Sequence, residues 1–150
     1  MKYSVCLLTA LSLILAGCAT SGSGAPAASE MNRVAALVVS KYPGKQVLIT
    51  TIEPAKNYLS NKMALAAIKA GAETNDSQAI KNLLANRKIE QVIVVTGVDD
   101  GLSAAILERA LLDGKGHIQG GRVVFVGSGE YTEGLRQAAD EAGVHIDFFH

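Results

Sequence analysis

Residues 91–96 (QVIVVT) and residues 122–126 (RVVFV) decide the fold. Both stretches are almost continuously apolar and rich in valine, which favours strands that are buried on both faces. Between them, residues 101–112 carry apolar side chains at helical spacing, with Asp99 or Asp100 as the helix cap. A buried strand, a helix and a second buried strand indicate a parallel sheet with right-handed crossovers.

Strands and helices keep alternating on both sides of this unit. The pattern predicts further helices at residues 31–41, 59–70, 75–87 and 132–142, and further strands at 46–52 and 144–149. Asn75 or Asp76 is the expected cap of its helix. Apolar and polar residues alternate in the last strand, which favours a half-exposed position at a sheet edge. The order predicts a small four-stranded parallel α/β sheet with helices packed on it, Rossmann-like or flavodoxin-like, and leaves the strand order open.

The composition limits the classes of partner. The length of 150 residues suits one domain, and 49% hydrophobic against 19% charged residues excludes a disordered chain. The 14 basic residues equal the 14 acidic ones, so no electrostatic attraction to nucleic acid is expected. Aromatic residues make up only 5% and tryptophan is absent, which argues against a surface that stacks bases or sugars.

The N-terminus has the features of an export signal. Lys2 precedes an apolar run from Val5 to Ala16, which is shorter than the roughly 20 residues of a membrane span. The run ends in Leu15-Ala16-Gly17-Cys18, which resembles the lipobox of bacterial lipoproteins at all four positions. The resemblance implies that residues 1–17 are a signal peptide, that Cys18 is acylated, and that the lipid holds the protein on a membrane.

The segment after the cysteine extends this interpretation. Ala19 stands where inner-membrane members of that family often carry Asp, which implies the outer membrane, with the domain facing the periplasm. Residues 18–29 are small and rich in Gly and Ser, typical of a flexible tether, and residues 30–150 are predicted to form a single α/β domain. Because Cys6 and Cys18 both precede it, this domain has no disulfide and no thiolate metal site. An ordinary secretory leader with a chance cysteine is the alternative.

Ligands of open parallel sheets bind outside the carboxyl ends of the strands, where three loops are expected. The first holds Thr51, Glu53 and Pro54, and the candidates come from the other two, at 97–101 and 127–132. The candidate ligand-binding residues there are Gly97, Asp99, Asp100, Gly127, Ser128, Gly129 and Thr132. The loop at 127–132 brings two glycines and two hydroxyls to a helix N-terminus, an arrangement that favours an anion. It does not match the GxGxxG fingerprint, so no cofactor is predicted, and a tight structural turn is the alternative.

No catalytic or metal-binding pattern stands out. Four loop carboxylates could gather around Mg²⁺, namely Glu53, Asp99, Asp100 and Glu130. The two aspartates also suit a helix cap, which is the simpler explanation. The three histidines, His117, His145 and His150, have no zinc spacing, and Ser128 lacks the GxSxG setting of a hydrolase nucleophile. No metal and no catalytic residue are assigned.

Residues 89–126 are similar in style to a half-lobe of periplasmic sugar-binding proteins, with an apolar strand, an Asp-containing loop, a helix and a second apolar strand. Those receptors bind their ligand between two lobes, whereas this chain is about one lobe long. It also lacks the aromatic residues that stack on sugars. The similarity supports the fold and not the ligand.

These observations favour a membrane-anchored periplasmic lipoprotein that acts as a non-enzymatic accessory module and binds a protein partner in an envelope assembly. Phe148 and Phe149 in the edge strand suggest where a partner strand would add. Packing of Phe149 under the N-terminal helix is the alternative for that residue. One alternative function is a small-ligand-binding domain that uses the loops at 97–101 and 127–132, and another is an enzyme of unrecognised type.

Overall fold

The computed structural model describes residues 28–118 and 120–150. Its elements are α1 (Ala28–Lys41), β1 (Gln46–Ile52), α2 (Tyr58–Lys69), α3 (Asn75–Asn86), β2 (Gln91–Gly97), α4 (Asp100–Asp113), β3 (Arg122–Val126), the 3₁₀ helix η1 (Gly129–Tyr131), α5 (Thr132–Ala142) and β4 (His145–Phe149). The first helix begins at Ala28, two residues before the predicted start of the domain at Glu30. The predicted signal peptide, Cys18 and the tether up to residue 27 lie outside the described residues. Within those residues, no helix is long and apolar enough to cross a bilayer.

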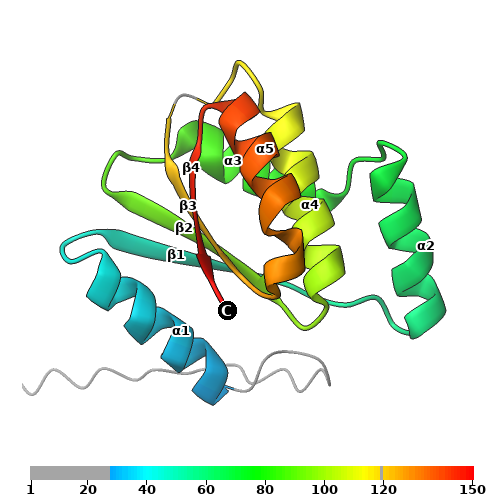
Figure 1. Cartoon of the computed structure of the whole chain (residues 1–150), viewed down its shortest axis with the longest axis horizontal. Helices are drawn as coiled ribbons and strands as arrows, with labels where there is room; N and C mark the ends of the chain where they lie inside the picture. The colour runs from blue at the N-terminus through cyan, green and yellow to red at the C-terminus, as the bar shows by residue number, and fades with distance from the viewer. Residues whose placement is uncertain (1–27, 119) are drawn as a thin grey trace, which may run out of the picture.

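The four strands form one parallel sheet in the order β1-β2-β3-β4 (Figure 1). This arrangement confirms the predicted α/β fold, Rossmann-like or flavodoxin-like in class, and the edge position of the last strand. The central residues of β2 and β3 are buried, as their continuous apolar sequences predicted. Because the strand order is consecutive and never reverses, these four strands lack the switch point at which doubly wound sheets bind ligands.

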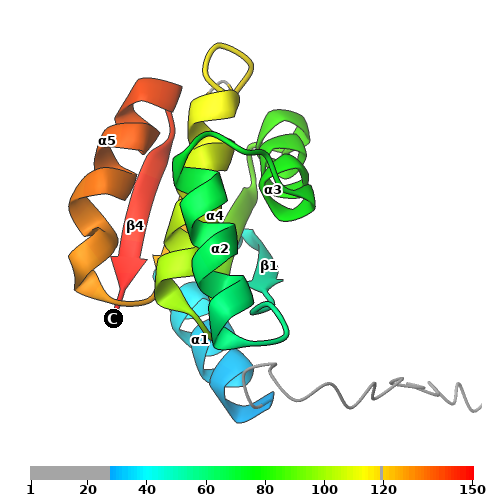
Figure 2. The ribbon, with the colours of Figure 1, turned by 90° about the vertical axis from the view of Figure 1, so that its right-hand side faces the viewer.

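The helices that connect the strands cover one face of the sheet (Figures 1 and 2). Right-handed crossovers between consecutive neighbours return to the same side each time. Helix α4 lies at the centre and packs against α2, α3, α5 and β2. Its side chains Leu107 and Leu111 are fully buried with Ile93 and Phe125 of the sheet, in a cluster that we call the crowded core. Helix α2 lies on the outer side of α4 (Figure 2).

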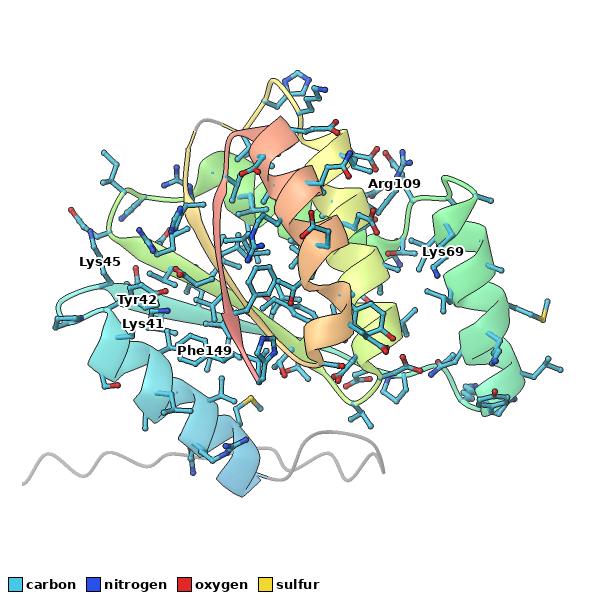
Figure 3. All side chains as sticks on the ribbon, in the orientation of Figure 1. Lys41, Tyr42, Lys45, Lys69, Arg109 and Phe149 are labelled. Carbon is cyan, nitrogen blue, oxygen red and sulfur yellow. The ribbon has the colours of Figure 1, made fainter. Side chains whose placement is uncertain are left out.

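Among the described elements, α1 alone covers the other face. A second cluster, which we call the sparse core, consists of five buried valines: Val34, Val38, Val92, Val94 and Val124. The rings of Tyr42 and Phe149 are partly buried against it (Figure 3). Phe149 therefore packs beneath the N-terminal helix, and Phe148 packs on the crowded core. Neither ring forms an open apolar edge.

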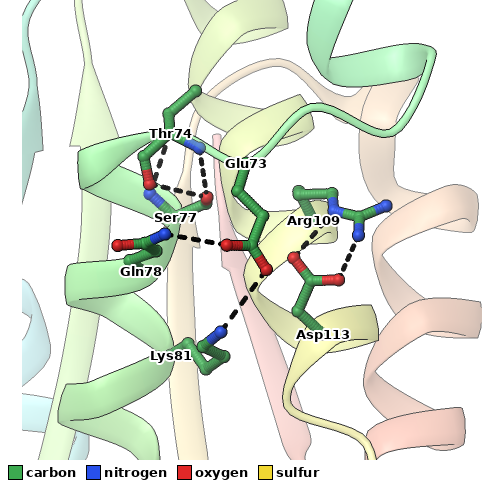
Figure 4. Close-up of polar contacts among 7 residues, drawn as sticks. All are labelled: Glu73, Thr74, Ser77, Gln78, Lys81, Arg109 and Asp113. Carbon is green, nitrogen blue, oxygen red and sulfur yellow. Dashed lines mark hydrogen bonds and ion pairs between the residues drawn. The ribbon is translucent and has the colours of Figure 1, made fainter.

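Side chains cap the starts of α2, α3 and α4, and one predicted cap was wrong. Thr74 caps α3 in place of Asn75 or Asp76, because Thr74 Oγ1 accepts from the amide of Ser77 at 3.0 Å. The Ser77 hydroxyl accepts from the amide of Thr74 at 2.9 Å in return, which completes a capping box (Figure 4). Asp99, one of the two predicted caps of α4, holds the start of that helix.

Candidate ligand-binding cleft

A cleft opens at the carboxyl edge of the sheet, between α1 and the ends of β2, β3 and β4. Its lining comprises Arg33 and Val34 of α1, the strand-end and terminal residues Thr96, Val126, Phe149 and His150, and Gly97, Val98, Asp100, Gly127 and Ser128 at the start of the βα loops. The cavity measures about 540 Å³. That volume falls within the roughly 300–1,000 Å³ of small-molecule sites. Helix α1 thus supplies the second wall that a reversal of strand order supplies in doubly wound folds.

Four of the seven candidate residues line this cleft: Gly97, Asp100, Gly127 and Ser128. The other three lie outside its lining. Asp99 is engaged as a cap, because its Oδ1 accepts from the amide of Leu102 and its Oδ2 from the amide group of Asn61, each at 2.9 Å. Gly129 begins η1 and Thr132 begins α5.

Hydrogen bonds tie the floor of the cleft together. Asp100 Oδ2 accepts from the amide of Ser128 at 2.9 Å and so joins the two βα loops. The amide of Gly127 donates to the carbonyl of Phe149 at 3.1 Å, and Nδ1 of His150 lies 2.8 Å from the Gly127 carbonyl. The Asp100 carboxylate therefore already accepts the hydrogen bond of the Ser128 amide that an anion bound at this turn would need. The loops are braced before any ligand arrives.

The glycines of the two loops are required by packing. A Cβ added to Gly97 would overlap the hydroxyl of Ser103 and lie 2.7 Å from the carbonyl oxygen of Ile52. A Cβ on Gly127 would lie 2.8 Å from the ring of Phe125. The atoms that approach both glycines belong to the protein itself. The tight turns of the loops therefore explain these glycines without a ligand. The cleft is what those turns leave open beneath α1.

Charge differs from one side of the cleft to the other. Arg33 stands on the α1 side, and sequence reasoning missed it because α1 meets the loops only through long-range packing. On the side of the βα loops, Asp100 is the acidic residue that lines the cleft, and Asp99 and Glu130 lie near it outside the lining. A hydrogen bond with Glu130 and burial raise the pKa of Tyr131 to about 12, with smaller contributions from the charges of Asp99 and Asp100. Arg33 and Asp100 both line the cleft, whereas Glu130 and Tyr131 line a neighbouring hollow beside α4.

The histidines and acidic residues do not converge. His150 lies in the cleft, His145 lies 3.8 Å from Asp147, and His117 is exposed in the loop after α4. In residues 28–118 and 120–150, no group of three or more His, Cys, Asp or Glu side chains could hold a metal ion. The Ser128 hydroxyl accepts from the amide of Glu130 at 3.5 Å, while His150 is directed to a backbone carbonyl. These two side chains are thus not arranged as a nucleophile and its base.

Comparison with known proteins adds no relative. Searches of protein-family models, of curated proteins and of solved structures found no match to the chain. Function is therefore inferred from the residues of the cleft and from the resemblance of the leader to a lipobox.

Proposed function

We propose that this protein is a lipid-anchored lipoprotein of the bacterial outer membrane whose periplasmic α/β domain binds a small ligand in the cleft under α1. The observation that carries the proposal is the cavity of about 540 Å³ lined by both predicted loops. Its walls combine apolar side chains with a few polar groups, which is the usual make-up of a ligand site. The apolar part includes Val34, Val126 and Phe149, and the polar part includes Arg33 and Ser128.

The cleft residues suggest the class of ligand. An apolar body would lie along Val126 and Phe149, and a polar or anionic group would face the guanidinium of Arg33. The role is binding rather than catalysis, because Ser128 and His150 each have a backbone partner and do not pair with each other. We therefore infer a non-enzymatic carrier or sensor domain.

The leader gives the proposed location. Leu15-Ala16-Gly17-Cys18 matches the lipobox pattern, and acylation with several chains anchors a protein stably. Helix α1 starts at Ala28, within the last two residues of the expected tether, and carries Arg33 only five residues later. At about 1.5 Å per residue, the cleft lies within about 8 Å of the start of α1 along the helix. The ligand site therefore lies close to the N-terminal end of α1, where the proposed tether would join the domain.

A cleft-filling variant tests the binding proposal. Ser128→Tyr places a ring in the cavity, and Glu133→Tyr adds the same ring to the exposed side of α5 as a matched control. The full-length protein, purified in detergent, is screened with small metabolites by thermal shift, and copurified molecules are identified by native mass spectrometry. We expect hits that Ser128→Tyr abolishes and Glu133→Tyr retains. Equal ligand-induced shifts in both variants would refute the cleft as the site.

The anchor is tested separately. Cys18→Ser removes the acylated thiol, so the protein is expected to leave the membrane fraction and to lose palmitate labelling. Unchanged labelling in this variant would rule out lipidation at Cys18. The result does not depend on whether the cleft binds a ligand.

An accessory role with an envelope protein as partner is the second candidate. It is favoured by the outer side of α2, where Tyr58, Leu59 and Met63 are 76%, 68% and 66% exposed. Exposed apolar side chains gathered on one helix are typical of a protein-binding surface. Crosslinking in cells with the pair Tyr58→Ser and Met63→Ser tests it. A specific partner captured by the native protein and equally by the variant would argue against α2 as the contact.

A further inference from the structure

A second pocket lies at the opposite, amino-terminal edge of the sheet. Three connections close around it: Tyr42 and Lys45 before β1, Arg87 and Ile89 before β2, and Gly121 with Arg122 at the start of β3. Its volume is about 310 Å³, and it shares no lining residue with the cleft under α1. Tyr42 and Lys45 are marked beside the end of α1 in Figure 3.

The charged side chains that line this pocket are all cations: Lys45, Arg87 and Arg122. The partly buried carboxylate of Asp147 pairs with Arg122 at 2.6 Å and with Lys41 at 3.4 Å. Lys41 offsets that negative charge. Glu90, next to Ile89, is exposed and not part of the lining. In a chain with equal numbers of acidic and basic residues, this is a local concentration of positive charge.

Neighbouring groups of the protein hold the two arginines in place. The guanidinium of Arg87 lies against Gly121, where an added Cβ would be 2.9 Å from Arg87 Cζ. Gly121 also has a φ of 128°, a conformation that side chains rarely adopt. Arg122 is fixed by Asp147 and lies 5.3 Å from the centre of the Tyr42 ring. Both guanidinium groups are thus positioned before a ligand binds.

Helix ends explain part of this charge and not the rest. Lys41 lies in the last turn of α1 and Arg87 follows α3, where cations interact favourably with the helix dipole. Lys45 and Arg122 belong to no helix, and yet they face the same cavity. Asp147 pairs with Arg122, and an anionic ligand in the cavity would bring all three lining cations to one group.

We propose that this pocket binds the phosphate group of a phosphate monoester. Arginine forks match phosphate oxygens bidentately, and Lys45 adds a point charge. A monoester carries about −1.5 to −2 charges at neutral pH, which suits three lining cations better than a single carboxylate does. The remainder of the ligand would lie on Val92, on the Tyr42 ring and on Ile89, whose side chain is 87% exposed.

Binding of phenyl phosphate to the full-length protein in detergent tests this proposal by isothermal titration. The variant Lys45→Gln/Arg87→Gln removes two lining cations, and Lys88→Gln removes an exposed neighbouring cation outside the lining. We expect saturable binding that weakens at least tenfold in the double variant, stays within about twofold in Lys88→Gln, and falls with added salt because screening grows. If the double variant does not fold, the exposed Lys45→Gln alone should still weaken binding several-fold.

Two further measurements sharpen the result. Inorganic phosphate that binds more weakly than phenyl phosphate would assign the apolar wall to the organic part of the ligand, and equal affinities would identify free phosphate as the ligand. The cleft variant Ser128→Tyr should leave phenyl phosphate binding unchanged, so failure of one site is distinguishable from failure of the other. No saturable binding of either probe, or equal binding by the double variant and Lys88→Gln, would overturn the proposal.

Discussion

The two faces of the sheet are covered very unequally. Of the described residues, 21 buried side chains form the crowded core under α3, α4 and α5, and five valines form the sparse core under α1. The same strands supply both cores, so the difference comes from the helices. The comparison shows that the connecting helices hold the fold together, while α1 is held by a few contacts. Both proposed sites border α1 or its end, and so they adjoin the weaker face.

The largest effect is expected from the crowded core. Phe125→Ala removes a fully buried ring and should lower the free energy of unfolding by about 3–5 kcal/mol. Chemical denaturation of the full-length protein measures it. The loss should be global, with α4 and the strands giving up hydrogen-exchange protection together. A loss below about 1 kcal/mol would mean that this core is not the main source of stability.

A smaller and local effect is expected on the other face. Val38→Ala removes two methyl groups from a fully buried side chain, at about 0.8 kcal/mol each. Helix α1 packs on the sheet mainly through Val34 and Val38, so hydrogen exchange should rise in α1 and remain slow in α4. Equal increases in both helices would break the distinction between the two faces.

The hydrogen bonds of Asp147, which lies beside the end of α1, should contribute less to the free energy of unfolding than Val38 does. Asp147, in β4, accepts hydrogen bonds from Tyr42 and Arg122 and pairs with Lys41. Asp147→Asn should cost about 1 kcal/mol, and Asp140→Asn on the exposed side of α5 should cost nothing measurable. Burial acts to raise the pKa of Asp147, but the hydrogen bonds and nearby cations lower it below 3.8. Its contribution is therefore present above about pH 4 and lost as the pH falls further, which acid titration of α1 exchange would detect.

The smallest expected effect is a change in the pKa of a tyrosine, which absorbance can follow. Burial and the hydrogen bond to Asp147 raise the pKa of Tyr42 to about 12, and Tyr131 is raised to about 12 near Glu130. The stabilisation by Tyr42 is therefore complete below about pH 10 and lost as the pH rises toward 12. Absorbance titration should show that Asp147→Asn lowers the pKa of Tyr42 toward 10 and leaves the pKa of Tyr131 unchanged. A titration identical to the native protein would show that Tyr42 does not depend on Asp147.

The crowded face could be predicted from the sequence, and the sparse face only in part, through the packing of Phe149 beneath the N-terminal helix. Continuous valine runs and helical spacing are local signals, so the strands at 91–96 and 122–126 and the helix between them were predicted correctly. Helix α1 packs on β1 and β2 and also beside Val124 of β3 and Phe149 of β4, and no local pattern encodes these last contacts. Arg33 in the cleft and the pairing of Tyr42 with Asp147 were missed for that reason.

The candidate loops and the cap of α3 likewise differ in how far the sequence predicts them. Parallel strands end at one edge, so Gly97, Asp100, Gly127 and Ser128 could be predicted to lie together. The capping of α3 could not, because Thr74, Asn75 and Asp76 are all acceptable caps. The choice depends on the reciprocal bond from Ser77, which is visible only once the turn has formed.

The consecutive strand order has a consequence for how the chain folds as it emerges. Gln46 pairs with Gln91, Val92 with Arg122, and Arg122 with His145, so each strand pairs with the one made just before it. The sheet can grow from one side, and no later strand has to be inserted between two earlier ones. Helix α1 is the exception, since Tyr42 and Asp147 lie 105 residues apart. The first helix of the domain to be synthesised is thus the last to complete its docking, and the cleft beneath it is finished only when the C-terminal strand is in place.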